Sequence, residues 1–200
     1  MLVIGLTGPS GSGKSLIAEM FAKYGLPIIN ADKVYHQLLI PPSPCLDELQ
    51  RVFGIEILRS DGSLDRRALA NIVFADPNSL AKLNEISHRY VMEDIRRRLR
   101  QLRNEHTRAA VLDAPQLFEA GANRDCGVIV SVLADARLRM ERIIRRDGID
   151  ADSAERRMAA QKNDEFFRSH SDYVLENNGN PEMLLPQIHR ILTETGVVQD

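Results

Sequence analysis

The sequence predicts an α/β fold with three layers, in which a parallel five-stranded sheet is flanked by helices. Short apolar runs alternate with helical stretches along the chain, and a glycine-rich loop joins the first run to the first helix. Alternation of this kind is typical of open parallel sheets that are covered by helices on both faces. A third observation is the long helical stretch between the second and third runs. This stretch is longer than a simple crossover connection between parallel strands, which indicates an inserted subdomain.

The expected strands are short and almost continuously apolar. Parallel strands that are buried on both faces have this character, whereas half-exposed strands alternate apolar and polar residues. The five expected strands are Leu2–Thr7, Pro27–Asn30, Ala109–Ala114, Gly127–Leu133 and Tyr173–Glu176.

The loop after the first strand carries the clearest chemical signal. Its sequence is Gly8-Pro9-Ser10-Gly11-Ser12-Gly13-Lys14-Ser15, which matches the phosphate-loop pattern G-x-x-x-x-G-K-[ST] at every fixed position. Loop amides at the positive end of the following helix stabilise a phosphate group. Lys14 is expected to reach the β- and γ-phosphates, and the Ser15 hydroxyl to ligate Mg²⁺. The alternative, a glycine-rich turn without a ligand, does not explain why a strand precedes the loop and a helix follows it.

Composition excludes several classes of protein. The net charge of −2 provides no general field for nucleic acid, and the 5% aromatic content argues against a base-stacking surface. No apolar run approaches the ~18 residues of a membrane span. We therefore expect no nucleic-acid or membrane partner. We also expect a cytoplasmic protein and a monomer, with weak self-association as the alternative.

The 200 residues suit a single domain with two additions. The expected core comprises residues 1–31, 104–135 and 171–200, with a helical acceptor-binding insertion at about 32–103 and a lid at about 136–170. Asp76-Pro77 begins the longest helix of the insertion, and Asp152 is expected to cap a helix of the lid. The lid is rich in arginine, which suits closure over a triphosphate; plain surface charge is the alternative.

Two aspartates follow expected strands at the edge where the phosphate loop lies. Asp32 follows the second strand, where a carboxylate can orient an acceptor hydroxyl, take its proton or hold Mg²⁺ through water. It can equally be the N-cap of the next helix. Asp113 ends the third strand, where it can assist the metal or serve only as a turn residue.

A phosphate loop alone does not identify a reaction. The chain has no N-K-x-D guanine-recognition motif and lacks the length of a motor or transporter ATPase, so the arrangement favours a small-molecule kinase. Another nucleoside or nucleotide kinase, and a nucleotide-binding protein without catalysis, remain the alternatives.

Further motifs resemble the dephospho-CoA kinase family over nearly the whole chain. The similarity lies in the opening strand and phosphate loop, in Ala31-Asp32, in a proline-bearing segment, in a D-G-x-L-x-R-x-x-L run, and in lid and closing-turn elements. The matching segments are Ile4–Gly8, Gly11–Ser15, Pro41–Pro44, Phe53-Gly54, Asp61–Leu69, Val73-Phe74, His88, Pro115–Glu119, Arg142, Arg145–Asp147, Arg157-Met158, Gln161, Asp172 and Asn177–Gly179.

The resemblance implies transfer of the γ-phosphoryl group of ATP to the ribose 3′-hydroxyl of dephospho-CoA, the last step of coenzyme A biosynthesis. It implies catalytic roles for Asp32, Lys14 and Arg142, with Mg²⁺ on Ser15. The residues implied for ATP are Gly11, Ser12, Gly13, Lys14, Ser15, Leu16, Arg146, Asn177 and Gly179. Those implied for the acceptor are Asp32, His36, Arg66, His88 and Glu119; for Arg66 and His88, surface charge and helix packing are the alternatives.

Two positions near Asp32 depart from the family pattern. Asn30 stands where the family usually has an aspartate, and His36 stands where an acceptor-contacting arginine is usual. Histidine is shorter than arginine and mostly neutral at pH 7, so we expect activity with an altered affinity for the acceptor.

Overall fold

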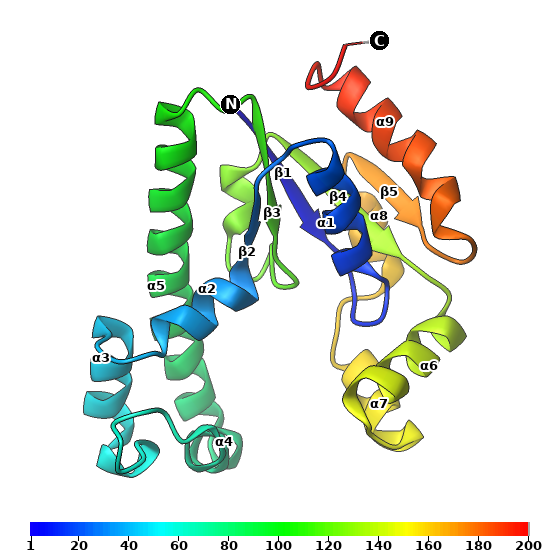
Figure 1. Cartoon of the computed structure of the whole chain (residues 1–200). Helices are drawn as coiled ribbons and strands as arrows, with labels where there is room; N and C mark the ends of the chain where they lie inside the picture. Colours follow the sequence, from blue (N-terminus) through cyan, green and yellow to red (C-terminus); the bar gives the residue numbers. More distant parts are fainter. Residues whose placement is uncertain (200) are drawn as a thin grey trace. The chain divides into compact units, whose positions relative to one another are not determined.

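The computed structural model describes residues 1–199 and has the expected alternation of strands and helices (Figure 1). The strands are β1 (Leu2–Thr7), β2 (Ile28–Asn30), β3 (Ala109–Asp113), β4 (Val128–Leu133) and β5 (Tyr173–Glu176). The α-helices are α1 (Lys14–Lys23), α2 (Ala31–Leu38), α3 (Pro44–Phe53), α4 (Arg66–Ala75), α5 (Pro77–Asn104), α6 (Ala136–Asp147), α7 (Ala151–Ala159), α8 (Asp164–Ser169) and α9 (Leu185–Glu194). Short 3₁₀ turns lie at Ile55–Ile57, Ala122–Asp125 and Pro181–Leu184.

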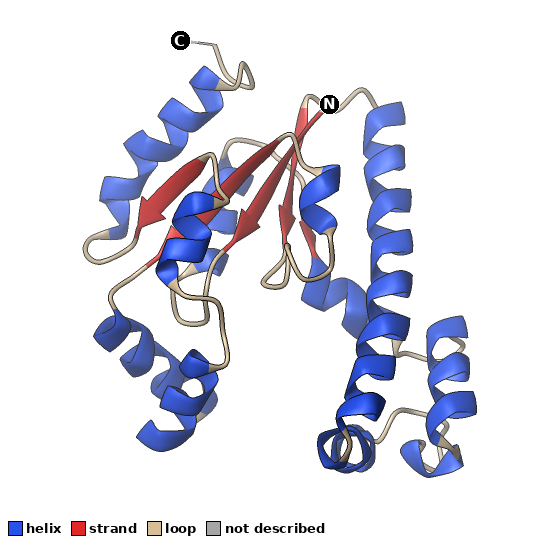
Figure 2. Ribbon diagram, turned by 180° about the vertical axis from the view of Figure 1, so that it is seen from behind, coloured by secondary structure: helices blue, strands red, loops and turns tan. Residues whose placement is uncertain are grey.

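The five strands form one sheet in the order β2-β3-β1-β4-β5, with helices on its sides (Figure 2). Strand β1 lies at the centre and pairs in parallel with β3 and β4, and β4 pairs in parallel with β5. The predicted fold class is confirmed, and the predicted strands differ from the observed ones by one residue at most. Because Leu6 is in register with Asp113, the ends of β1 and β3 lie together just before the phosphate loop.

The chain divides into two compact units. The first comprises Met1–Ile29 and Leu102–Asp200, and the second comprises Asn30–Gln101. The first unit contains the phosphate loop and the α6–α7 hairpin, and the second contains α2, α3 and α4 with most of α5. The roles predicted for these segments, acceptor binding for the second unit and lid for residues 136–170, stay predictions.

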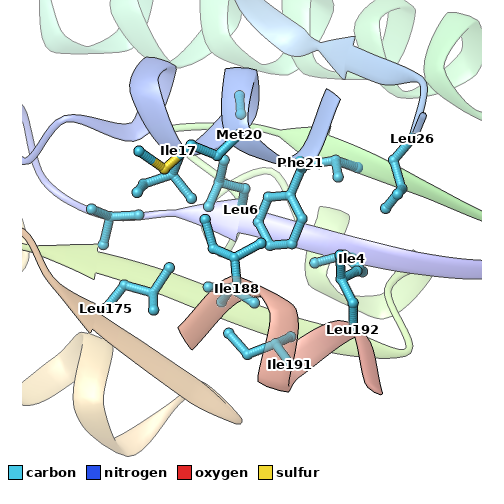
Figure 3. Packing of buried hydrophobic residues seen from close by; sticks show 14 of the residues in the cluster. Ile4, Leu6, Ile17, Met20, Phe21, Leu26, Leu175, Ile188, Ile191 and Leu192 are labelled. Atoms are coloured by element: carbon cyan, nitrogen blue, oxygen red, sulfur yellow. The ribbon is translucent and has the colours of Figure 1, made fainter. Parts of the chain in front are cut away.

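The core of the first unit lies between the central strands and two helices (Figure 3). Helix α1 contributes Ile17, Met20 and Phe21, and α9 contributes Ile188, Ile191 and Leu192, all of them buried. These side chains pack on Ile4 and Leu6 of β1, together with Val111, Val130, Val132 and Leu175. The burial on this side of β1 fixes α1, and therefore the loop immediately before α1, against the sheet.

The second unit has an apolar cluster of its own. Leu49 of α3 and Ile57 are fully buried, and Leu69 and Val73 of α4 pack with Ile86 of α5 in the same cluster. Helix α5 begins as predicted: the Asp76 carboxylate accepts hydrogen bonds from the backbone N–H groups of Asn78 and Ser79, at 3.1 and 2.9 Å.

The predicted cap of the second lid helix is wrong by two residues. Asp150, not Asp152, caps α7, because the Asp150 carboxylate accepts a hydrogen bond from the Ser153 N–H at 2.7 Å. Asp150 has the extended backbone of an N-cap residue, whereas Asp152 already lies inside the first helical turn.

No helix within residues 1–199 is both long enough and apolar enough to cross a membrane.

Replacement of Phe21 by alanine tests the packing of α1 on the sheet. Phe21 is fully buried, so Phe21→Ala is expected to lower the free energy of unfolding by about 3–5 kcal/mol. Phe74→Ala is the matched control: that ring is 78% exposed, and its loss is expected to change the free energy by no more than about 0.5 kcal/mol. Urea unfolding of both variants measures the difference, and equal losses would contradict this account of the core.

Candidate active site

The phosphate loop connects β1 to α1, and three glycines allow its backbone to make the turns. Gly8, Gly11 and Gly13 have φ angles of 135°, 78° and 96°, a region that side chains with a Cβ atom rarely occupy. Gly13 is the N-cap residue of α1 and has no side chain that could accept from the amides of the first turn. Uncapped first-turn amides are the donors that bind anions at helix N-termini.

Every carbonyl from Gly8 to Ser12 accepts a hydrogen bond. Lys14 Nζ donates to the carbonyls of Gly8 and Pro9, at 2.7 and 3.2 Å. The next three carbonyls are bound by side chains from distant parts of the chain. Arg139 Nε lies 3.1 Å from Ser10 O, Arg142 Nη1 lies 3.2 Å from Gly11 O and 3.4 Å from Ser12 O, and Asn177 Nδ2 lies 2.8 Å from Ser12 O.

These carbonyl contacts set the direction of the loop amides. In a trans peptide the C=O and the following N–H point in opposite directions, so a donor that holds a carbonyl also orients the next amide. The amides of Gly11 and Gly13 follow the held carbonyls of Ser10 and Ser12, and neither has an acceptor within residues 1–199. They are therefore available to an anion.

Other loop amides are used within the protein. The Ser12 N–H donates to Pro9 O at 3.3 Å, and the Leu16 N–H donates to Gly13 O at 3.1 Å. The Ser10 N–H donates to Gln161 Oε1 at 3.0 Å. The Ser15 amide and hydroxyl make no hydrogen bond to any residue of the described chain, so Ser15 presents both a donor and an oxygen ligand.

Two loop glycines leave no room for a side chain. A Cβ atom on Gly11 would lie 2.6 Å from the backbone oxygen of Arg139, and one on Gly13 would lie 2.1 Å from Asn177 Nδ2. Helix α6 and the turn after β5 therefore contact the loop backbone directly.

The predicted lid residues Arg142 and Arg146 both contact the loop. Arg142 also donates to the Asn177 carbonyl at 3.0 Å. Arg146 Nη2 lies 3.2 Å from Ser10 Oγ, and Arg146 Nε pairs with Asp147 at 2.8 Å. The hydrogen bond to Asp147 raises the pKa of Arg146, and the same contact lowers the pKa of Asp147. Arg157 also binds Asp147 and joins α7 to the end of α6.

Asn177 and Gly179 follow β5, as predicted. Asn177 is buried and links the turn to the phosphate loop, while Gly179 is exposed. Glu119 lies exposed in the segment after β3, and Asp113 is buried at the end of that strand.

The predicted acceptor residues Asp32 and His36 lie on one face of α2 in the second unit. With Lys33 and Gln37 they line a cavity of about 280 Å³. Asp32 does not cap the helix: Asn30 does, because its side chain accepts a hydrogen bond from the Lys33 N–H at 2.8 Å. The exposed Asp32 carboxylate makes no hydrogen bond or ion pair with any of residues 1–199, so the capping alternative is wrong.

Arg66 lies beside this cavity and His88 lies on α5. Arg66 Nη2 is 3.4 Å from His36 Nδ1, so a cation stands next to the histidine that replaces the usual arginine. His88 is half-buried. Among residues 1–199, no group of three or more His, Cys, Asp or Glu side chains forms a metal site.

Arg139 and Ser10 are the loop contacts whose roles sequence reasoning missed. The sequence places Arg139 among the arginines of the predicted lid at about 136–170 and Ser10 in the phosphate loop, without indicating a contact between them. A usable signal exists in the helical spacing, because Arg139, Arg142 and Arg146 are three and four residues apart and share one face of α6.

Comparison with known proteins identifies the family. The family model described as dephospho-CoA kinase matches residues 2–182. The chain belongs to the dephospho-CoA kinase family. It is 39% identical over 188 residues to the dephospho-CoA kinase of Syntrophotalea carbinolica, covering 94% of this chain and 89% of that one. It is 37% identical over 194 residues to that of Corynebacterium glutamicum, covering 97% of each.

Solved structures give the same fold. A Thermus thermophilus protein, TT1252, has 32% identity and a TM-score of 0.82, with 96% of this chain and 97% of that one covered. The dephospho-CoA kinase of Campylobacter jejuni has 23% identity and a TM-score of 0.71, with 96% of each covered. Shikimate kinase from Acinetobacter baumannii shares only the fold, with a TM-score of 0.56 at 15% identity, over 98% and 94% of the two chains.

Gly13→Ala tests whether the loop backbone must touch Asn177. The Cβ atom would displace the Asn177 amide and strain a φ of 96°, which together cost about 2–3 kcal/mol. We expect the Kd for Mg-ATP, measured by calorimetry, to rise at least about 30-fold.

Gly25→Ala is the control, because Gly25 also has a positive φ, of 79°, but within residues 1–199 no heavy atom apart from its chain neighbours lies within 4 Å of the added Cβ. It is expected to bind Mg-ATP like the unaltered chain. Equal weakening in both variants would mean that backbone strain, rather than obstruction, matters.

Proposed function

We propose that this chain transfers the γ-phosphoryl group of ATP to the ribose 3′-hydroxyl of dephospho-CoA, giving CoA and ADP. The observation that carries the proposal is the family match over residues 2–182, which includes a phosphate loop with two glycine amides free for an anion. The reaction is the last step of coenzyme A biosynthesis. We further propose a cytoplasmic monomer that takes two small-molecule substrates.

The first unit supplies the nucleotide site in this proposal. The amides of Gly11, Gly13 and Ser15 bind the phosphate chain, and Lys14 exchanges its two carbonyl partners for the β- and γ-phosphates. Arg146 covers the adenine. Ser12, Leu16, Asn177 and Gly179 complete the site; Ser12 and Leu16 act by shaping the loop, since their amides donate within it.

The Ser15 hydroxyl fits a magnesium ion. It is an exposed oxygen with no hydrogen bond inside residues 1–199, and Mg²⁺ is usually held by few protein oxygens together with substrate phosphates. The ion neutralises phosphate charge when it is bound. Asp113, buried at the end of β3, is a second candidate for that site.

The second unit supplies the acceptor site. Asp32 orients the ribose hydroxyl and takes its proton as the hydroxyl oxygen bonds to the γ-phosphorus. The bond between the γ-phosphorus and the oxygen that bridges it to the β-phosphate breaks at the same time, and ADP leaves with that oxygen. Phosphoryl transfer depends mainly on positioning and charge stabilisation, so Asp32 need not be strongly basic. His36, Arg66 and His88 of this unit contact the rest of the acceptor, as does Glu119, which belongs to the first unit.

Arg142 has the third catalytic role in this proposal. Its guanidinium neutralises charge that develops on the transferring phosphoryl group. The same guanidinium holds the Gly11, Ser12 and Asn177 carbonyls, so Arg142 also shapes the loop.

A coupled assay tests the substrate. ADP formation from Mg-ATP is measured with dephospho-CoA, adenosine, AMP or pantothenate as the acceptor, and we expect turnover with dephospho-CoA. Turnover only with adenosine or AMP would indicate a nucleoside or nucleotide kinase instead. ATP binding without product from any acceptor would indicate a nucleotide-binding protein without catalysis.

Asp32→Ala tests the proposed proton acceptor. Loss of a general base typically costs at least ~100-fold in rate, so kcat with dephospho-CoA should fall by at least that factor, while the Kd for Mg-ATP stays unchanged. Asp47→Ala is the matched control, because Asp47 is another exposed aspartate in the first turn of a helix of the second unit. An unchanged kcat for Asp32→Ala would remove Asp32 from this role.

A further inference from the structure

One face of α6 contacts the phosphate loop and carries Arg139, Arg142 and Arg146. Arg139 is the most buried of these three arginines. The residue is only 6% exposed, whereas Arg142 on the same face is half-buried and Arg146 is exposed. An arginine is almost never buried to this extent unless its guanidinium has partners. Its partners therefore indicate what the residue does.

Among residues 1–199, the Arg139 side chain has two hydrogen-bond partners, one of them in the loop. Nε donates to the Ser10 carbonyl at 3.1 Å, and Nη1 lies 3.3 Å from the Asp164 carboxylate, which belongs to the first turn of α8. The carboxylate thus contacts one end of the guanidinium while Nε donates to the loop. Burial lowers the pKa of Arg139, and the nearby Asp164 charge opposes that shift.

The backbone of Arg139 contacts the loop as well. The Arg139 oxygen would lie 2.6 Å from a Cβ on Gly11, and its Cα would lie 2.9 Å from that atom. Helix α6 thus touches the loop at the peptide between Ser10 and Gly11, and the side chain of the same residue holds the carbonyl of that peptide.

Holding this carbonyl has a direct consequence for the anion site. The Gly11 amide points away from the Ser10 carbonyl across the trans peptide, and it has no acceptor in residues 1–199. We propose that Arg139 is a positioning residue for nucleotide binding, because it holds the Ser10–Gly11 peptide with the Gly11 amide directed at the phosphates of ATP. This inference rests on the proposed nucleotide site but not on the identity of the acceptor.

Three substitutions separate the hydrogen bond from the charge. The side-chain nitrogen of glutamine occupies the same place along the chain as Arg139 Nε, so Arg139→Gln keeps a donor for Ser10 O and loses the charge. Arg139→Lys keeps the charge but has a methylene group at that place. Arg139→Met has a methyl group there and keeps neither.

The readout is the Kd for Mg-ATP, measured by calorimetry without any acceptor. A charged hydrogen bond to the loop is worth enough that Arg139→Met and Arg139→Lys are expected to weaken binding at least about 10-fold. Arg139→Gln is expected to stay within about threefold of the unaltered chain. In the kinase assay the KM for ATP should rise in the Met and Lys variants, while the KM for dephospho-CoA should not change.

Arg137→Met is the matched control. Arg137 lies on the same helix, its side chain is 90% exposed, and it pairs only with Glu141 among residues 1–199. We expect this variant to bind Mg-ATP like the unaltered chain. Circular dichroism and the Tm of each variant monitor folding. If Arg139→Met does not fold, the proposal is tested by comparing the Kd for Mg-ATP of Arg139→Gln with that of Arg139→Lys.

Several outcomes would overturn the proposal. Binding within twofold of normal in Arg139→Met, with a lowered Tm, would show that Arg139 only packs. If Arg139→Lys kept Mg-ATP binding and Arg139→Gln lost it, the contribution of Arg139 would come from its charge and not from its hydrogen bond to the Ser10–Gly11 peptide. No Mg-ATP binding by the unaltered chain would contradict both this proposal and the nucleotide site, whereas ATP binding without dephospho-CoA turnover would contradict the acceptor alone.

Discussion

The candidate site depends on donors that hold the carbonyls of the phosphate loop. A loop whose amides face an anion must turn its carbonyls the other way, and buried carbonyls without a partner are costly. Arg139, Arg142 and Asn177 satisfy three successive carbonyls, from Ser10 to Ser12. These donors come from α6 and from the turn after β5, so the shape of a loop near the amino end is set by segments more than a hundred residues away.

The same contacts limit how the predicted lid can move. The amino-terminal half of α6 holds the loop through Arg139 and Arg142 and touches Gly11 directly. If α6 swung away as a whole, the Ser10 and Gly11 carbonyls would lose their donors. The closure predicted for the lid would therefore involve the far part of the hairpin, whose Arg146 and Gln161 contact Ser10 of the loop. The contacts of Arg146 and Gln161 with Ser10 are exposed, so replacing them by contacts with substrate costs little free energy. Exposing the buried Arg139 and breaking its bonds would cost much more.

Local patterns in the sequence were sufficient for the fold and for the loop. Strands and helices follow from apolar runs, and the motif between β1 and α1 needs only its own eight residues. The partners of the loop carbonyls did not follow. The spacing of the arginines in α6 indicates that they share one face, but no short-range pattern indicates that this face and the turn after β5 pack on the loop. The cap of α2 was missed for a different reason: Asn30 and Asp32 are both good N-cap residues, and only the backbone conformation distinguishes them.

The departure at Asn30 has a limited physical effect. Asparagine caps a helix about as well as aspartate, so the observed bond from the Lys33 amide to Asn30 preserves the start of α2. An aspartate at this position would replace the amide donor by a second carboxylate oxygen and would place a negative charge two residues before Asp32. Both positions are at least partly open to solvent, where repulsion between like charges is screened. The capping oxygen of Asn30 therefore preserves the start of α2, and the Asp32 carboxylate, which does not cap the helix, lines the cavity with His36.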